Sequence, residues 1–251
     1  MAGHSHAANV KRRKDSVNAK KAKIFSKCAR HIVSACRVGG ADVDQNPRLA
    51  LAVEKARAAN MPKDNIERAI KKGAGNKDGE EFQELVYEGY APGGSALMIV
   101  CLTDNRNRTA PDIKFCLEKR GGNLGAQGSV SFLFDLRSVF VVESNDKEED
   151  ELMEIALEAG AEDVKVEEGI ATFYGDATEF IELKGTLEAA GYEEFLTAEI
   201  SYVPQTVTEV PTIEEAKKLL KLIEALEDNE DVQTVSGNFR INPEWEEELS
   251  S

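Results

Sequence analysis

The sequence has few of the side chains that usually carry enzyme chemistry. Its 251 residues include three histidines, of which His4 and His6 stand at the N-terminus and His31 lies within a basic segment. None of them pairs with a Ser, Cys or Asp in a pattern typical of nucleophilic catalysis. We therefore expect a protein that is not an enzyme and has no catalytic residue.

Motifs for cofactors and metals are also missing. Gly122, Gly125 and Gly128 form neither a G-x-G-x-x-G turn after a strand nor a Walker loop, so they indicate a tight connection between two elements. The carboxylates from Asp146 to Glu151 are typical of a solvated helix start, where the helix dipole favours negative charge, rather than of a metal cage. The sequence thus predicts no cofactor, no metal and no small-molecule substrate.

Long apolar runs and paired cysteines are absent as well. No run approaches the ~18 apolar residues of a membrane-spanning helix, and the charged N-terminus lacks the apolar segment of a signal peptide. The four cysteines, Cys28, Cys36, Cys101 and Cys116, form no C-x-x-C pair and are typical of reduced core residues. We expect a cytoplasmic protein that contacts no membrane.

What the sequence does contain is a strong separation of charge. The chain has 31 Lys and Arg against 46 Asp and Glu, a formal net charge of −15. Residues 1–75 nevertheless hold 17 basic and six acidic side chains, a net charge of +11, which leaves −26 for residues 76–251. Such asymmetry indicates a basic module that meets nucleic acid, held on an acidic body that does not.

The segment from Lys11 to Arg37 combines basic residues with a helical apolar pattern. At 100° per residue, one arc holds Phe25, Cys28, Ala29, Ile32 and Cys36, and the opposite arc holds Lys20, Lys23, Lys27, Arg30 and Arg37. This predicts a helix with a core face and a cationic stripe, the stripe being Lys20, Lys23, Lys27 and Arg30. Ahead of the pattern, Lys11, Arg12, Arg13 and Lys14 have no apolar period and indicate a mobile basic arm. Arm and stripe together would bind a polyanion, and the alternative is an ordinary solvated helix face.

Two further helices would complete a basic three-helix domain at residues 1–78. Asn46 offers an N-cap before Pro47, and Pro62 begins a third helix that ends at Gly73. The glycines from Gly73 to Gly79 indicate a hinge.

Beyond Glu84 the apolar period becomes that of strands, and the order of elements predicts an α+β fold. We expect the N-terminal three-helix domain to be followed by two ferredoxin-like α/β sandwich domains, one inserted in the other. The inserted domain spans residues 137–204 with the order β-α-β-β-α-β, and its host spans residues 79–136 plus 205–245. The host's expected elements are strands at 85–90, 96–102, 129–134 and 232–241, a helix from Thr109 to Gly121 and a helix at 213–226.

A polar run, Asp104 to Thr109, joins a buried strand to a helix. It brings Arg106 and Arg108, two amides and a hydroxyl onto one loop of an otherwise acidic domain. Backbone phosphate or an RNA base edge would suit these donors. Alternatively, Asp104 and Thr109 cap the turn while the arginines pair with nearby glutamates. The sequence leaves both interpretations open.

Several strings of residues resemble the YebC/PmpR family. They are Met1 to Ser5, Asn60 to Gly73, Tyr87 to Tyr90, Pro92 to Gly94, Asp104 to Thr109 and Gly121 to Gly125. The likeness spans nearly the whole chain, although His6 and Ala7 stand where the family usually has Lys-Trp. The resemblance implies a three-domain cytoplasmic protein that acts as a DNA-binding transcriptional regulator, with mitochondrial relatives that are translational activators.

Residues and resemblance together predict a non-enzymatic regulator of gene expression that binds nucleic acid through the arm, the stripe, Arg106 and Arg108. The first hypothesis is a DNA-binding transcriptional regulator, and the alternative is a ribosome-associated translation factor that binds ribosomal RNA. The sequence shows no helix-turn-helix signature or zipper for the first, and no aromatic-rich RNA-reading strand for the second. Both hypotheses leave the oligomeric state open.

Overall fold

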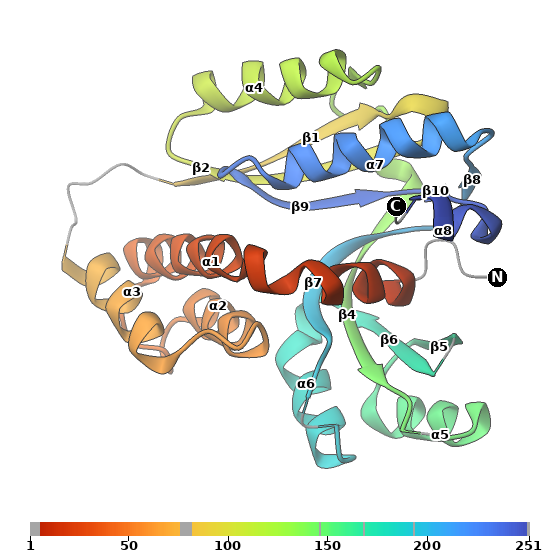
Figure 1. Cartoon of the computed structure of the whole chain (residues 1–251). Helices are drawn as coiled ribbons and strands as arrows, with labels where there is room; N and C mark the ends of the chain where they lie inside the picture. Colours follow the sequence, from red (N-terminus) through yellow and green to blue (C-terminus); the bar gives the residue numbers. More distant parts are fainter. Residues whose placement is uncertain (1–5, 76–81, 146, 168, 193, 250–251) are drawn as a thin grey trace. The chain divides into compact units, whose positions relative to one another are not determined.

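The chain forms two compact units in a computed structural model (Figure 1). The structure describes residues 6–75, 82–145, 147–167, 169–192 and 194–249, and it describes side chains from residue 22 onward, except those of residues 246–247. Of the described residues, those of 82–135 and 202–249 form unit 1, and those of 6–75 and 136–201 form unit 2. Helices at the N-terminus are followed by sheets of mixed α/β content, which confirms the predicted fold class.

Three helices open unit 2: α1 (His6–Gly39), α2 (Pro47–Ala58) and α3 (Lys63–Gly75). The buried side chain of Asn46 ties α2 to the end of α1. Its Oδ1 accepts the N–H of Leu49 at 3.2 Å, as the predicted N-cap requires, and its Nδ2 donates to the carbonyls of Ala35 and Gly40. Ile32, Leu49 and Ala56 are fully buried between the helices.

Helix α1 begins at His6, so the prediction of a mobile arm at Lys11 to Lys14 was wrong for the backbone. The segment 6–38 contains no Pro or Gly and is rich in Ala, Lys and Arg, which all favour helix. Intrinsic propensity therefore extends the helix beyond the part that an apolar face supports. The side chains of Lys11, Arg12, Arg13, Lys14 and Lys20 lie outside the described residues.

Gly73 lets α3 cross α1 at very short distance. A Cβ at this position would lie 2.5 Å from the Cβ of Cys36 and 3.1 Å from the carbonyl oxygen of Val33. Real Cβ atoms do not approach other carbons so closely, so any side chain here would push the two helices apart.

The second part of unit 2 has the predicted β-α-β-β-α-β order (Figure 1). Its antiparallel sheet has the strand order β5-β6-β4-β7. Helices α5 and α6 cover a core in which Phe140 stacks on Phe180 with ring centroids 4.8 Å apart. The elements are β4 (Phe134–Glu143), α5 (Glu149–Ala159), β5 (Asp163–Glu167), β6 (Ile170–Asp176), α6 (Phe180–Ala189) and β7 (Thr197–Pro204).

Helix α2 contacts α6 within unit 2. Lys184 of α6 has an 11% exposed side chain, and its Nζ lies 3.3 Å from a carboxylate oxygen of Glu54 on α2. Leu51 of α2 packs against the core beneath α6. The helical part thus shares unit 2 with residues 136–201, and the division of the chain into three domains stays a prediction. The expected hinge runs into residues 76–81, outside the described residues.

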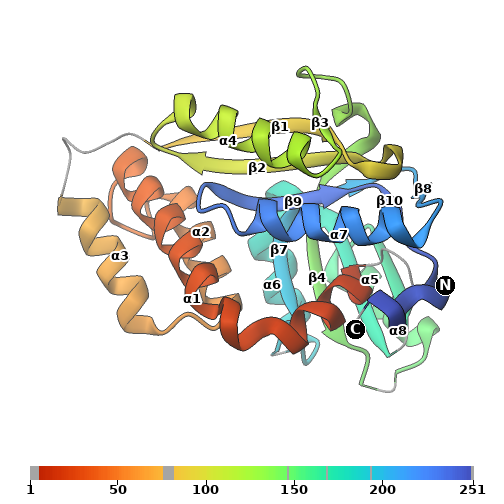
Figure 2. The ribbon, with the colours of Figure 1, turned by 45° about the horizontal axis from the view of Figure 1, so that its top comes forward.

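Unit 1 is a four-stranded antiparallel sheet with the order β3-β1-β2-β9 (Figure 2). The central strand β2 is buried on both faces: Leu97, Ile99 and Cys101 meet helices α4 and α7, whereas Ala96 and Met98 meet Val130 and Phe134. The elements are β1 (Gln83–Tyr90), β2 (Ala96–Thr103), α4 (Arg106–Lys119), β3 (Asn123–Leu124), α7 (Ile213–Glu227) and β9 (Val232–Gly237), with a parallel pair β8 (Thr208–Glu209) and β10 (Phe239–Arg240) and a short α8 (Glu246–Leu249).

Two expected strands of unit 1 are different in the structure. Of the strand expected at 129–134, residues 129–133 are not a strand but contain a 3-10 turn at Ser131–Leu133, because the N–H groups of Val130 and Ser131 donate to the carboxylate of Glu88 instead of to a neighbouring strand. The strand expected at 232–241 is divided at Asn238, whose side chain accepts the N–H of Ala96 and donates to Thr208. Over the described ranges, no helix combines the length and the hydropathy needed to cross a membrane.

Candidate nucleic-acid interface

The cationic stripe lies on α1, in unit 2. Lys23 is exposed, whereas Lys27 and Arg30 are half-buried and therefore less accessible than the helical period predicts. The opposite side of α1 enters the core, where Ile32 is fully buried and Cys36 is 4% exposed. The two-faced helix is thus present.

Helices α2 and α3 add basic side chains that the helical pattern of α1 did not reveal. Helix α3 follows a short turn at residues 59–62, in which Asn60 adopts a positive φ of 58°, and its solvent face exposes four cations. Ten of the 17 basic residues at 1–75 fall between Lys11 and Arg37, so the count alone could have indicated the other seven. These seven are Arg48, Lys55, Arg57, Lys63, Arg68, Lys71 and Lys72.

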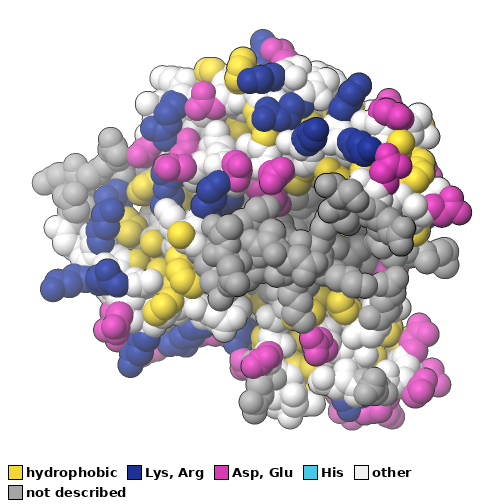
Figure 3. Space-filling model, viewed as in Figure 1, with side chains coloured by type: hydrophobic (Ala, Val, Ile, Leu, Met, Phe, Trp, Pro, Cys, Tyr) yellow, Lys and Arg dark blue, Asp and Glu magenta, His cyan; other side chains and the backbone are white. Residues whose placement is uncertain are grey.

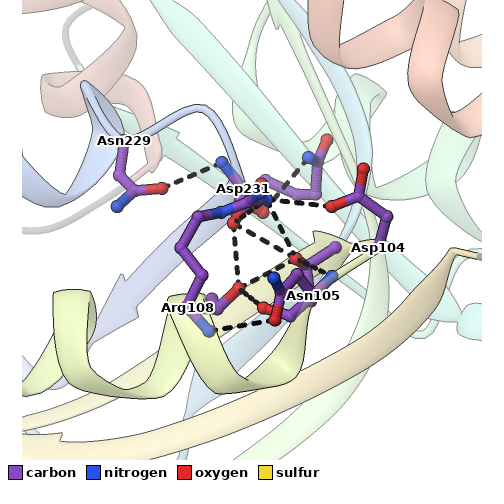
Figure 4. A network of polar contacts seen from close by, with 8 residues as sticks. Asp104, Asn105, Arg108, Asn229 and Asp231 are labelled. Atoms are coloured by element: carbon purple, nitrogen blue, oxygen red, sulfur yellow. Dashed lines mark hydrogen bonds and ion pairs between the residues drawn. The ribbon is translucent and has the colours of Figure 1, made fainter. Parts of the chain in front are cut away.

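The polar loop that precedes α4 is built around a buried carboxylate from a distant part of the chain (Figure 4). Asp231, whose side chain is 5% exposed, accepts hydrogen bonds from the hydroxyls of Thr103 and Thr109 at 3.2 and 2.8 Å. The Nη2 of Arg108 lies 3.0 Å from Asp231 and 3.0 Å from Asp104. These contacts join the end of β2, the start of α4 and the start of β9.

This network favours the structural interpretation for Arg108. Its partners are aspartates rather than the expected glutamates, and the hydrogen bonds that Arg108 donates to Asp231 and then to Asp104 raise its pKa above the ordinary value. In the alternative that the sequence left open, Asp104 and Thr109 cap the turn, whereas the N-cap of α4 in the structure is Asn105, whose side chain accepts the N–H of Arg108 at 3.2 Å. A helix start at Arg106 places the capping side chain immediately before it.

Arg106 has a different environment from Arg108. It is exposed, and it forms no ion pair with any residue that the structure describes. Of the two arginines, Arg106 is therefore the one with a guanidinium that a phosphate could reach without breaking the loop.

A second buried carboxylate, which the sequence did not single out, holds the connection between β3 and β4. Glu88 accepts the backbone N–H groups of Gly128, Val130 and Ser131 at 2.6, 2.7 and 2.9 Å. Burial alone raises the pKa of Glu88, but these donors outweigh burial, so the pKa lies below its ordinary value. The glycines at 122–128 belong to this anchored connection.

Comparison with known proteins places both parts of the chain in one family. Residues 5–76 match the family model described as "TACO1/YebC protein N-terminal domain", and residues 82–239 match the model described as "TACO1/YebC second and third domain". The chain belongs to the TACO1/YebC family. The resemblance seen in the sequence is thereby confirmed.

Relatives in the TACO1/YebC family match this chain from end to end. A protein of Halothermothrix orenii is 49% identical over 100% of this chain and 99% of its own length, and one of Aquifex aeolicus is 47% identical over 97% and 98%. Both carry the name "Probable transcriptional regulatory protein". A crystal structure of a conserved hypothetical protein from Aquifex aeolicus superposes with a TM-score of 0.80 at 46% identity, covering 90% of this chain and 93% of that one.

The described residues of this TACO1/YebC chain offer little to a catalytic interpretation. Burial raises the pKa of Cys28 to about 11, so its thiol is protonated at neutral pH. Burial also raises the pKa of Cys36 and of Cys116, and the side chain of Cys101 is buried. No group of three His, Cys, Asp or Glu residues in the described ranges could hold a metal ion. The relatives carry a regulator's name rather than an enzyme's name.

Proposed function

We propose that this protein is a regulator of gene expression that binds nucleic acid through its N-terminal helices. The observation that carries the proposal is the net charge of +11 in residues 1–75 of a chain whose total is −15. Phosphates attract such a surface and release counterions on contact, whereas the acidic remainder repels non-specific contact with the same polymer. Arg106 would add a contact from unit 1.

A DNA-binding transcriptional regulator is the first candidate. It agrees with the names of the relatives. Helices α2 and α3 also have the order of a helix, a short turn and a second helix, and α3 exposes Arg68, Lys71 and Lys72. In DNA-binding proteins with that order, the second helix enters the major groove.

A ribosome-associated translation factor that binds ribosomal RNA is the second candidate. The observation that favours it is an exposed aromatic ring, Phe115, among cations on α4. Unpaired bases of folded RNA stack on such rings, whereas bases within a DNA duplex do not offer their faces.

The experiment that tests the proposal replaces Lys20, Lys23, Lys27 and Arg30 with Gln. Binding of the variant to duplex DNA and to ribosomes would be measured over a range of salt concentrations, by fluorescence anisotropy and by sedimentation on sucrose gradients. If each cation neutralises one phosphate on duplex DNA, the slope of log affinity against log salt should become shallower by about 0.9 per cation, or nearly 4 in all. On ribosomes the slope should also become shallower.

The matched control replaces four cations that have acidic or aromatic partners outside the N-terminal helices. These are Arg137, Lys147, Lys165 and Arg240. This control should keep the wild-type slope. An unchanged slope in the stripe variant, on both DNA and ribosomes, would make the stripe a solvated helix face and overturn the proposal.

A further inference from the structure

The acidic part of the chain has a basic region of its own. Residues 76–251 contain 14 basic side chains, and eight of these fall in α4, at its C-cap residue or in α7. The two helices and this C-cap residue together contain six acidic residues, so they carry a net charge of +2 within a segment of −26. The eight are Arg106, Arg108, Lys114, Lys119, Arg120, Lys217, Lys218 and Lys221.

These two helices lie side by side in unit 1. Both pack on the same face of the sheet through Ile113 and Leu117 of α4 and Leu219 and Leu222 of α7. The space-filling view shows Lys and Arg side chains gathered over them, with acidic side chains interspersed (Figure 3). We call this surface the α4–α7 face.

Several lysines of the α4–α7 face are available to a ligand. Lys119, Lys218 and Lys221 are exposed and form no ion pair with residues in the described part of the chain. Lys218 lies one helical turn before Leu222, whose Cδ2 is 3.3 Å from the place of a Cβ at Gly122, just beyond the end of α4. Lys218 is therefore on the same side of α7 as Leu222, toward the connection that follows α4.

An exposed aromatic ring lies beside one of these cations. The side chain of Phe115 is 64% exposed, and the Nζ of Lys119, one turn later on α4, is 5.4 Å from the centre of its ring. Burial of a Phe ring is strongly favourable, so a ring that remains in solvent contributes little to the fold. Aromatic rings with cations beside them are the stacking platforms of proteins that bind single strands.

We propose that the α4–α7 face binds an unpaired segment of single-stranded nucleic acid, with one base stacked on Phe115 and the adjacent phosphates on Lys119, Lys218 and Lys221. This rests on the proposed function and adds a second contact surface to it. A duplex would use the lysines but not the ring, because its bases are stacked on one another. An acidic peptide would likewise use only the lysines.

The test uses the full chain and a 12-nucleotide single strand that carries 2-aminopurine, in an RNA form and a DNA form. Phe115→Ala should weaken binding about five-fold or more and remove the quenching of 2-aminopurine by stacking, whereas Phe115→Trp should keep both. Phe132→Ala is the matched control, since Phe132 is 68% exposed in the same unit but lies on the 3-10 turn at Ser131–Leu133. It should bind as the wild type does.

The lysines are tested by Lys218→Gln and Lys221→Gln together. On a single strand this double variant should make the salt slope shallower by about 0.7 per contact, or about 1.4 in all. Lys165→Gln is the control, because Lys165 is also an exposed lysine near an aromatic ring, at 5.5 Å from Tyr174. It should leave the slope unchanged.

The outcomes separate this inference from the proposed function. If Phe115→Ala binds the single strands as tightly as the wild type while the stripe variant loses affinity, the α4–α7 face is not a binding site and the proposed function stands. The inference is also wrong if polyglutamate displaces the single strand as readily from the wild type as from Phe115→Ala, because a competitor that uses only the lysines should be less effective where the ring adds affinity. If the wild type binds neither single strands, duplex DNA nor ribosomes, both proposals are wrong.

Discussion

The two ends of helix α4 carry cations and use them in opposite ways. At the N-terminal end, Arg108 is held by Asp104 and by Asp231, whose side chain is buried. At the C-terminal end, Lys119 is exposed and its Nζ lies over the ring of Phe115. The same charge is therefore a structural element at one end and an accessible surface group at the other.

The helix dipole explains this difference. The N-terminus of a helix carries partial positive charge, so a guanidinium there needs compensating carboxylates, which the fold brings from just before β9 (Asp231) and just after β2 (Asp104). The C-terminus carries partial negative charge and stabilises a cation without any carboxylate. A basic residue is thus a better candidate for ligand binding near the end of a helix than near its start, unless it extends away from the helix as Arg106 does.

The largest effect should come from removing the carboxylate at the N-terminal end. Asp231→Ala leaves Thr103, Thr109 and Arg108 without their common acceptor, and loss of one partner from a buried charged network costs about 3 kcal/mol. The free energy of unfolding, measured with urea, should fall by that amount.

Asp104→Ala is the control for this prediction. Asp104 pairs with Arg108 at 3.0 Å and is less buried than Asp231, so its removal should cost less than about 1 kcal/mol. Equal losses for the two variants would mean that Asp231 does not dominate the network.

Glu88 extends the comparison to a carboxylate whose donors are backbone amides. Glu88→Gln should cost about 2 kcal/mol at pH 7, because a buried amide side chain replaces a carboxylate that accepts three N–H groups. Since the pKa of Glu88 is lowered in the folded state, its stabilising contribution is present above the pKa of the unfolded chain and is lost as pH falls through the folded pKa. The stability difference between wild type and variant should therefore shrink on acidification from pH 7 to pH 3, as urea titrations at both values would show. A difference that grows instead would contradict this assignment.

The two arginines of the loop give a smaller, paired prediction. Arg108→Ala should lower the free energy of unfolding by about 1 kcal/mol, a value reduced by the 47% exposure of the side chain, whereas Arg106→Ala should change it by less than about 0.5 kcal/mol. Nucleic-acid affinity should show the reverse order, with the larger loss in Arg106→Ala. Thermal unfolding and anisotropy on the same samples would check both, and a larger affinity loss in Arg108→Ala would contradict the assignment.

The smallest effect concerns the C-terminal end of α4. Lys119→Gln removes a cation that interacts favourably with the dipole and with the ring of Phe115, so stability should fall by only about 0.5 kcal/mol. The loss should diminish at high salt because the side chain is exposed. A loss that is independent of salt would indicate that Lys119 is held by packing instead.

The sequence predicted those features that depend on neighbouring residues. The Asn46 cap, the apolar side of α7 and the β-α-β-β-α-β order can all be derived from local period and capping chemistry. The pairing of Arg108 with Asp231 could not, because 123 positions separate them and nothing local marks Asp231 as a partner. Helix α1 was predicted too short because the prediction required an apolar period, whereas the helix propensity of the residues alone supports its first turns.

The close crossing at Gly73 has a consequence for experiments that score every substitution in a gene. Any residue other than glycine would separate α3 from α1 and displace the cations on both helices at once. In a selection for nucleic-acid binding, this position should tolerate fewer replacements than any single lysine of the stripe, because losing one phosphate contact weakens binding only partially. A map of mutational tolerance would therefore mark a residue that touches no ligand as the most sensitive one. Sensitivity in such a map measures how many contacts depend on a position, and it does not identify which atoms make them.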